Sequence, residues 1–326
     1  MKVWDLHCDT LSVLRGREQA GEKVSFAQND LQIDLQKLTR GGYGLQCLAA
    51  FIDLDDAPAD DPLVNVQEQA DLFHRIVEAY PAQVAPVYKG ADIDANAAAG
   101  KISLMLTVEE GGCCKGSLGA LRNLYRLGAR MMTLTWNHEN QLAWPNSGSG
   151  GMVTVPNTGM GLKDRGREFV TEMEHLHMIV DVSHLSDRGF WDLTECAMRP
   201  FAASHSNCRS LAPHCRNLTD EMLRWMGEHG CLAGLNYCAG FLEDDPCAQA
   251  STVDAIARHA AHMKQVGGID MIALGSDFDG IQYGPDMDDA SQLPKLAHAL
   301  TAAGFTAAEV EKILWENARR FFIENL

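Results

Sequence analysis

Short apolar segments rich in β-branched residues alternate along the chain with longer segments that have helical periodicity. The short segments predict eight β-strands, at residues 3–9, 44–52, 102–109, 129–136, 178–184, 201–206, 231–237 and 271–277. The longer segments predict helices, among them residues 62–80, 117–127, 166–175, 187–197, 219–228 and 253–266. Strands that alternate with helices in this number are typical of a (β/α)8 TIM barrel, and this is the α/β fold that we predict.

The last helix has the clearest boundary signal. Thr306 and Glu309 form a capping box ahead of an apolar face that consists of Val310, Ile313, Leu314, Ala318 and Phe321. We expect this helix to close the barrel. A doubly wound open sheet is the competing fold, but no G-x-G-x-x-G follows the first strand, and no linker rich in Pro, Gly or Ser divides the chain. We therefore predict a single barrel domain over residues 1–326.

Composition and charge narrow the class of protein. Hydrophobic residues make up 46% of the chain and charged residues 22%, which excludes a disordered protein. The 27 Lys and Arg against 44 Asp and Glu give a formal charge of −17, so nucleic acid and anionic membranes are unfavourable partners. The 10 cysteines include no C-x-x-C pair, and we find neither a signal peptide nor an apolar run that could span a membrane. We expect a cytoplasmic protein with reduced thiols.

Polar residues gather where the predicted strands end. His7 and Asp9 are two residues apart in an extended segment, so both side chains project from the same face. Other strand ends carry Glu109-Glu110, Ser183-His184, Ser204-His205 and Asp277. In a barrel these ends surround one mouth, where the active sites of this fold are built. Histidines and carboxylates are the usual zinc ligands, so the set could hold two divalent ions.

Several of these segments resemble a known family. They read DLHCDT, TVEEGG, VDVSHLS, ASHSNCRSLAPHCRNLTD and GSDFDGI, in this order over nearly the whole chain. The sequence resembles the membrane (renal) dipeptidase family, peptidase family M19 of the amidohydrolase superfamily. The resemblance implies a site with two Zn²⁺ ions, with His7 and Asp9 on one ion and His184 and His205 on the other. It also implies a glutamate that bridges the two ions.

Two adjacent glutamates match the position of the bridging residue. Because side chains alternate along a strand, only one of Glu109 and Glu110 can face the mouth. We choose Glu109, since Thr107, two residues earlier, is small enough to face inward, whereas Glu110 follows the bulkier Leu106 and Val108.

The resemblance also assigns roles around the metal ions. Arg216 matches the residue that holds the substrate carboxylate, and Asp277 matches the residue at the reacting centre, where it would carry the proton. One position departs from the family pattern, because Trp136 stands where relatives carry a histidine that polarises the scissile carbonyl. His138, two residues later, could take that role and contact the substrate. If it does not, Asn137 or a zinc ion must serve.

The function expected from these residues is that of a zinc-dependent dipeptidase, in which a metal-activated hydroxide attacks the peptide bond. A two-metal amidohydrolase that acts on a non-peptide amide or a lactone is the alternative, and the carboxylate anchor Arg216 discriminates between them. A metal-binding scaffold without catalysis is a third interpretation. The family resemblance favours a homodimer. It also favours acceptance of a D-configured carboxyl-terminal residue, although the sequence leaves this, the native metal and the preferred side chains open.

Overall fold

The computed structural model describes residues 1–55, 61–146, 155–282 and 284–326. In this part of the chain nine strands form one parallel sheet. They are β1 (Val3–Asp5), β2 (Tyr43–Phe51), β3 (Val84–Pro86), β4 (Ile102–Glu109), β5 (Met131–Thr133), β6 (Ile179–Asp181), β7 (Ala202–Ala203), β8 (Leu232–Leu235) and β9 (Ile272–Leu274). All eight strands predicted from the sequence are present, each within or close to its expected range.

Eight of these strands close into a barrel. β1 pairs with β2 on one side and with β9 on the other, and β2 continues to β4, with Phe51 opposite Glu109. The short strand β3, which the sequence pattern did not predict, pairs with β4 outside the closed ring. Unlike the other short strands, β3 contains a proline, Pro86, which argues against a strand in a sequence pattern. The prediction of a (β/α)8 barrel is confirmed.

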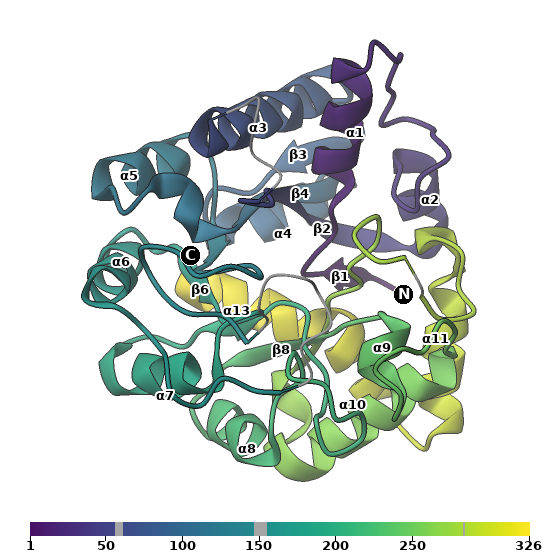
Figure 1. The fold of residues 1–326 in the computed structure, drawn as a ribbon. Helices are drawn as coiled ribbons and strands as arrows, with labels where there is room; N and C mark the ends of the chain where they lie inside the picture. Colours follow the sequence, from purple (N-terminus) through teal and green to yellow (C-terminus); the bar gives the residue numbers. More distant parts are fainter. Residues whose placement is uncertain (56–60, 147–154, 283) are drawn as a thin grey trace.

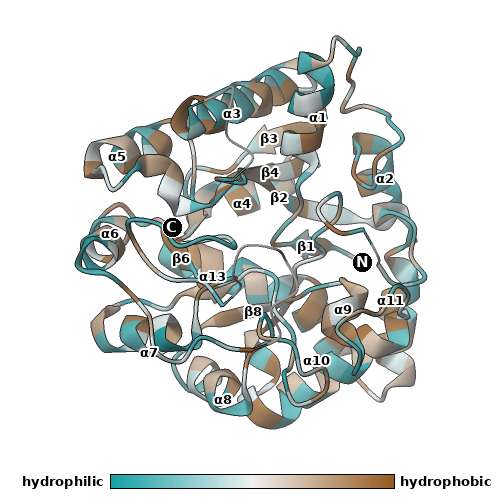
Figure 2. Cartoon of the chain, in the orientation of Figure 1, coloured by the Kyte–Doolittle hydropathy of each residue, from teal (hydrophilic) through white to brown (hydrophobic). Residues whose placement is uncertain are grey.

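Helices surround the strands in a ring (Figure 1). The helices are α1 (Thr10–Gln19), α2 (Leu35–Gly41), α3 (Pro62–Ala79), α4 (Gly90–Ala98), α5 (Leu118–Arg126), α6 (Asp164–His175), α7 (Asp187–Cys196), α8 (Asp220–Glu228), α9 (Ala239–Leu242), α10 (Val253–Gly267), α11 (Pro294–Ala302), α12 (Ala307–Glu311) and α13 (Asn317–Asn325). Hydrophobic and hydrophilic residues alternate along many of them (Figure 2), as expected for helices with one face on the barrel. Within the described ranges no helix is long and apolar enough to cross a membrane.

Side-chain alternation along the strands divides the core into two clusters. Met105 of β4 belongs to the cluster inside the barrel, whereas Leu106 and Val108 belong to the cluster between strands and helices. Glu109 is four residues after Met105 and therefore lies on the inward face at the carboxyl end of β4. The same alternation is the reason why the sequence predicts that Glu109, rather than Glu110, faces the mouth.

The carboxyl-terminal helix covers the amino-terminal end of the barrel. The capping box predicted at Thr306 and Glu309 is present, and a π-helical turn (Lys312–Glu316) joins α12 to α13. The ring of Trp4 inside the barrel stacks on Phe322 at 5.0 Å between centroids and lies 5.5 Å from Trp315. Because this end is filled with apolar side chains, the opposite, carboxyl end is the mouth that can hold a functional site.

Candidate metal centre and active site

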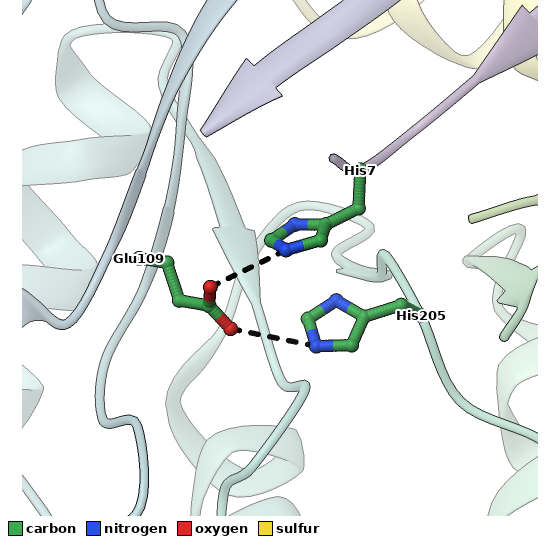
Figure 3. Close-up of side chains that lie close together, drawn as sticks. All are labelled: His7, Glu109 and His205. Atoms are coloured by element: carbon green, nitrogen blue, oxygen red, sulfur yellow. Dashed lines mark ion pairs between the residues drawn. The ribbon is translucent and has the colours of Figure 1, made fainter. Parts of the chain in front are cut away.

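Six side chains from five strand ends meet in the mouth. His7 and Asp9 follow β1, Glu109 ends β4, His184 follows β6, His205 follows β7 and Asp277 follows β9. The five predicted metal ligands are buried, from 1% to 8% exposed, and Asp277 is partly buried. Figure 3 shows the two imidazoles of His7 and His205 turned towards the carboxylate of Glu109. The structure thus brings all five predicted metal ligands together with Asp277.

The carboxylate of Glu109 lies between two groups of ligands. Its Oε2 is 3.3 Å from Nε2 of His7. Its Oε1 is 3.0 Å from Nε2 of His184 and 3.5 Å from Nε2 of His205. Each carboxylate oxygen therefore faces a different side of the site. This is the geometry required of a carboxylate that bridges two metal ions.

The remaining donors have spacings that fit metal coordination. Nε2 of His7 is 3.4 Å from Oδ2 of Asp9, and the Nε2 atoms of His184 and His205 are 3.1 Å apart. A tetrahedral zinc ion with bonds of about 2.0–2.2 Å needs ligand atoms about 3.3–3.6 Å from one another. The spacing of His7 and Asp9 lies within this range, and that of His184 and His205 is about 0.2 Å below it. Imidazole nitrogens and carboxylate oxygens are also the ligand types that zinc prefers. The residues present therefore fit a pair of divalent ions.

Burial and neighbouring charges set the protonation of these groups. Burial and the positive charge of Arg216 lower the pKa of His184 to about 3, and burial with the charge of His7 lowers the pKa of His205 well below its usual value. Burial alone would raise the pKa of Glu109, but the histidines around it hold that pKa well below its usual range. These shifts favour the neutral imidazoles and the ionised carboxylate that bind metal ions. Two other predicted ligands are shifted the opposite way: despite its burial, His7 has a pKa raised well above its usual value by the charges of Glu109 and Asp9, and burial raises the pKa of Asp9.

Glu110 points to a different part of the structure. Its Oε1 accepts hydrogen bonds from the backbone N–H of Gly112 (2.6 Å) and from Asn140 Nδ2 (2.5 Å), and its Oε2 accepts one from the backbone N–H of Trp136 (2.8 Å). These bonds fix the loop after β5 against the end of β4. Burial raises the pKa of Glu110 to about 6. The alternative ligand considered from the sequence is therefore engaged with three amide N–H donors.

Two buried carboxylates that the sequence analysis did not single out hold the strand ends. Oδ1 of Asp181 accepts the backbone N–H groups of Ser183 and Ser204, at 2.9 Å each, next to His184 and His205. Oδ1 of Asp5 makes the same kind of bridge, from the backbone N–H of His7 (3.3 Å) to that of Ser276 (2.8 Å). Both aspartates lie at the end of an apolar strand, and this shared position is the signal by which the sequence could have identified them.

Hydrogen bonds to the second ring nitrogen orient two of the predicted ligands. Nδ1 of His205 is 2.7 Å from Oγ of Ser204, and that hydroxyl donates to Oδ2 of Asp181 at 2.5 Å. Nδ1 of His184 is 2.9 Å from Oδ1 of Asn137. Such partners fix the tautomer and the ring orientation of metal-binding histidines. The Nε2 atoms of both rings are thereby left to face Glu109.

Replacing Ser204 by alanine should weaken metal binding. We expect the dissociation constant for zinc to rise by about 10- to 100-fold in Ser204→Ala, because His205 loses the group that holds its ring. Competition between the protein and a chelator measures this constant. Ser210→Ala, which removes a hydroxyl from the exposed residue Ser210, is the matched control and should leave the constant unchanged. Equal zinc affinity in Ser204→Ala and the unaltered protein would contradict the orienting role.

Asp277 lies at the edge of the ligand cluster. Its Oδ1 is 3.8 Å from Nε2 of His7, and its Oδ2 accepts a hydrogen bond from Asn236 Nδ2 at 2.9 Å. Burial raises its pKa, despite the opposing charge of His7.

Asp277 and His184 both have left-handed backbones, with φ of 63° and 70°. This is a strained conformation that non-glycine residues adopt mainly where the fold enforces it.

Close backbone approach at Gly280 completes the turn after Asp277. A Cβ atom at this position would lie 2.0 Å from Oδ2 of Asp9 and 2.8 Å from Oδ1 of Asp277. Only glycine avoids both carboxylates, so the Asp277–Gly280 turn can pack directly against the ligand cluster.

Arg216 is buried beside this cluster, in the loop between β7 and α8. Its Nη2 donates to the backbone carbonyl of His205 at 3.3 Å, and its guanidinium lies 5.6 Å from the ring centre of Phe241. Its buried Nε has no hydrogen-bond partner among the residues that the structure describes. An unpartnered donor on a buried guanidinium costs free energy, which an anionic ligand would recover. The side chain is thus suited to bind a carboxylate in the mouth.

His138 is directed elsewhere. Its Nε2 is 2.9 Å from Oδ1 of Asp53, and its Nδ1 is 3.4 Å from Oδ2 of Asp55, both in the loop after β2. The ring of Trp136 packs near both histidines, 5.6 Å from the ring of His138 and 5.9 Å from the ring of His184. The structure therefore does not bring His138 to the predicted metal ligands, whereas Asn137 contacts one of them.

Comparison with known proteins adds an independent line of evidence. A family model described as membrane dipeptidase (peptidase family M19) matches residues 1–325. An uncharacterized dipeptidase of Schizosaccharomyces pombe is 32% identical to this chain over 336 residues, covering 98% of this chain and 79% of the relative. An uncharacterized Klebsiella pneumoniae protein is 31% identical over 258 residues, covering 79% of this chain and 94% of the relative.

Solved structures agree with the sequence comparison. Dipeptidase AC, a metallopeptidase of family M19 with a known crystal structure, is 26% identical in sequence to this chain. The two structures superimpose with a TM-score of 0.90, covering 100% of this chain and 98% of the other. A metallopeptidase from Rhodobacter sphaeroides, liganded with a phosphinate mimic of the dipeptide L-Ala-D-Ala, is 25% identical with a TM-score of 0.90, covering 100% and 99% of the two chains.

Proposed function

Since this chain belongs to the membrane dipeptidase family, peptidase family M19, and is a metal-dependent dipeptidase, we propose that its barrel mouth holds two Zn²⁺ ions and binds a dipeptide. His7 and Asp9 would hold one ion, His184 and His205 the other, and Glu109 would bridge them. The observation that carries this proposal is that the two oxygens of Glu109 face different histidines, at 3.0–3.5 Å.

Arg216 would bind the free carboxylate of the substrate. Support comes from the burial of Arg216 and from its unpartnered Nε next to the ligand cluster. A guanidinium can bind a carboxylate through two parallel hydrogen bonds, which fix the orientation as well as the distance. A substrate held in this way by its carboxyl end places its last peptide bond near the metal ligands, which restricts its length to about two residues.

Asp277 would move the proton during hydrolysis. When bound, divalent ions in such a site polarise the peptide carbonyl and lower the pKa of water towards about 7. Asp277 would accept the proton of the attacking water and deliver it to the departing amine. Support comes from the position of its Oδ1 at 3.8 Å from His7, and from Asn236, which holds the other oxygen in place.

For polarisation of the scissile carbonyl we retain His138 as a candidate. Its contact with Asp53, at 2.9 Å, has to break before the ring can turn to a substrate. Asn137, which is already hydrogen-bonded to His184, and a metal ion are the other candidates.

The Rhodobacter sphaeroides relative with its mimic of L-Ala-D-Ala supports the proposal that a D-configured carboxyl-terminal residue is accepted. A homodimer and a cytoplasmic location remain predictions from the sequence.

Amino acid release from dipeptides tests the proposed function. Protein stripped with a chelator and then loaded with zinc should cleave a panel of L-L and L-D dipeptides, while the metal-free protein should not. Dipeptides whose carboxylate is blocked as an amide should be cleaved poorly, because they cannot pair with Arg216. Zinc-loaded protein that cleaves no member of the panel would contradict the proposal and favour a non-peptide amide or lactone as the substrate.

A further inference from the structure

The segment that carries Arg216 is irregular and depends on side chains for its shape. Residues 207–218 contain neither a helix nor a strand, and one isolated bridge, between Cys208 and Leu218, joins the two ends. Buried backbone groups of such a loop need partners from outside regular structure. Arg209 and Asn217 each supply two such side-chain partners, Arg209 to the carbonyl oxygens of residues 215 and 217, and Asn217 to the N–H of residue 207 and the carbonyl oxygen of residue 212.

Arg209 binds the backbone on both sides of Arg216. Its Nε donates to the carbonyl oxygen of Asn217 at 2.8 Å, and its Nη2 donates to the carbonyl oxygen of Cys215 at 2.9 Å. Between these two carbonyls, the backbone N–H of Arg216 donates to Nδ1 of His214 at 3.1 Å. The guanidinium of Arg209 therefore fixes the peptide group between Cys215 and Arg216, from which Arg216 extends, and the peptide group that follows Asn217.

The other edge of the same guanidinium is anchored to a neighbouring loop. Nη1 and Nη2 of Arg209 lie 2.6 and 2.8 Å from the two carboxylate oxygens of Asp187, which begins α7 three residues after His184. Asn146, from the loop after β5, donates to both Asp187 Oδ1 and the carbonyl oxygen of Cys215, at 2.8 Å each. The position of Arg216 is thus tied to the loop that carries a predicted metal ligand.

Arg216 itself has little to hold its side chain. Its guanidinium makes one hydrogen bond in the described part of the protein, at 3.3 Å, and its Nε has no partner. With so few polar contacts of its own, the guanidinium depends for its direction on its backbone together with the packing around it. We propose that Arg209 is a positioning residue that fixes Arg216 for the substrate carboxylate and so sets the selectivity for dipeptides with a free carboxyl terminus. This proposal rests on the proposed function, in which Arg216 is the carboxylate anchor.

Lysine cannot replace Arg209 in this role. An ammonium group keeps the charge opposite Asp187 but cannot span its two oxygens and the carbonyls of Cys215 and Asn217 at once, because it lacks the planar fork. The fold should therefore tolerate Arg209→Lys, while the anchor loses its fixed position. A displacement of about 1 Å at a positioning group can cost about 100-fold in catalytic efficiency.

Kinetics on paired substrates test the proposal. For each zinc-loaded variant, kcat and KM are measured on a dipeptide and on the same dipeptide with a carboxyl-terminal amide. In Arg209→Lys we expect KM for the free dipeptide to rise by about 10- to 100-fold with kcat within about 3-fold. The reason is that a contact which binds the substrate and the transition state equally raises KM when it is lost and leaves kcat unchanged. The preference for the free carboxylate over the amide should fall by the same factor.

Two further variants separate the possible failures. Arg258→Lys alters an exposed arginine that pairs with Glu243 and should leave both substrates unaffected. Arg216→Met, which removes the cation, should itself lose the preference for the free carboxylate. If it does not, the anchor of the proposed function is wrong. If Arg216→Met loses the preference and Arg209→Lys keeps it, the positioning role of Arg209 is overturned while the anchor stands. Equal losses on both substrates in Arg209→Lys, with a lowered melting temperature, would also overturn that role in favour of a purely structural one.

Discussion

Asp277→Asn should abolish turnover while the protein keeps its metal ions. The amide that replaces the carboxylate cannot accept the proton of the attacking water, and general acid–base groups contribute about 10²- to 10⁴-fold to such reactions. Metal content should persist because the substitution leaves all five predicted ligands in place and asparagine keeps an oxygen at the position of the aspartate, next to His7 and Asp9. Amino acid release from a dipeptide measures kcat, and zinc per chain measures the metal content.

The same turn supplies a control for this experiment. Asp279 accepts hydrogen bonds from Thr10 Oγ1 (2.7 Å) and from the backbone N–H of Gln32 (2.7 Å), so its carboxylate holds the turn to α1 and to the loop before α2. Asp279→Asn should lower the melting temperature while kcat falls far less than in Asp277→Asn. Turnover in Asp277→Asn near that of the unaltered protein would remove Asp277 from the proposed mechanism.

Glu109→Gln should lose most of the stabilisation that metal ions give to the fold. Ligands that bind only the native state add about 4 kcal/mol at a free concentration about 1,000 times the dissociation constant. In the unaltered protein zinc would offset the repulsion between the buried carboxylates of Glu109 and Asp9 and the partly buried carboxylate of Asp277. A glutamine cannot offer a carboxylate oxygen to each of two ions. Thermal unfolding with and without zinc should therefore show a large upward shift for the unaltered protein and a small one for Glu109→Gln.

The neighbouring glutamate is the matched comparison. Glu110 accepts three N–H donors, and a glutamine would leave at least one of them opposite its own amide N–H. Glu110→Gln should thus cost about 1–3 kcal/mol of stability with or without zinc, while the shift caused by zinc persists. A zinc shift that is lost in Glu110→Gln and kept in Glu109→Gln would reverse the two assignments.

Several parts of this molecule could be read from local features of the chain. Alternation of side chains along β4 places Glu109 and Met105 on the same, inward face and turns Leu106 outward. Strand ends of a parallel barrel meet at one mouth, so polar residues such as His184 and His205 were predicted to lie together although no contact between them can be read from the sequence.

Other parts depend on contacts between segments distant in sequence. His138 is two residues from Trp136, but its direction is set by Asp53, 85 residues earlier, because that carboxylate lies 2.9 Å from its ring. Arg209 likewise contacts Asp187, 22 residues away, through two hydrogen bonds that the spacing of these residues in the sequence does not predict. Loop side chains have no periodic constraint, and their partners are chosen by packing and charge.

The sequence by itself therefore determined the barrel, its sealed end and the group of metal-binding side chains predicted at the mouth, because strand periodicity and residue type are local properties. Only the tertiary structure decided how the mouth loops are held: Glu110 on three N–H groups, and the Asp187–Arg209 pair around Arg216. The physical reason is that a buried polar group takes whichever partner the closed fold brings within hydrogen-bond distance, and that partner is defined only once the barrel has formed.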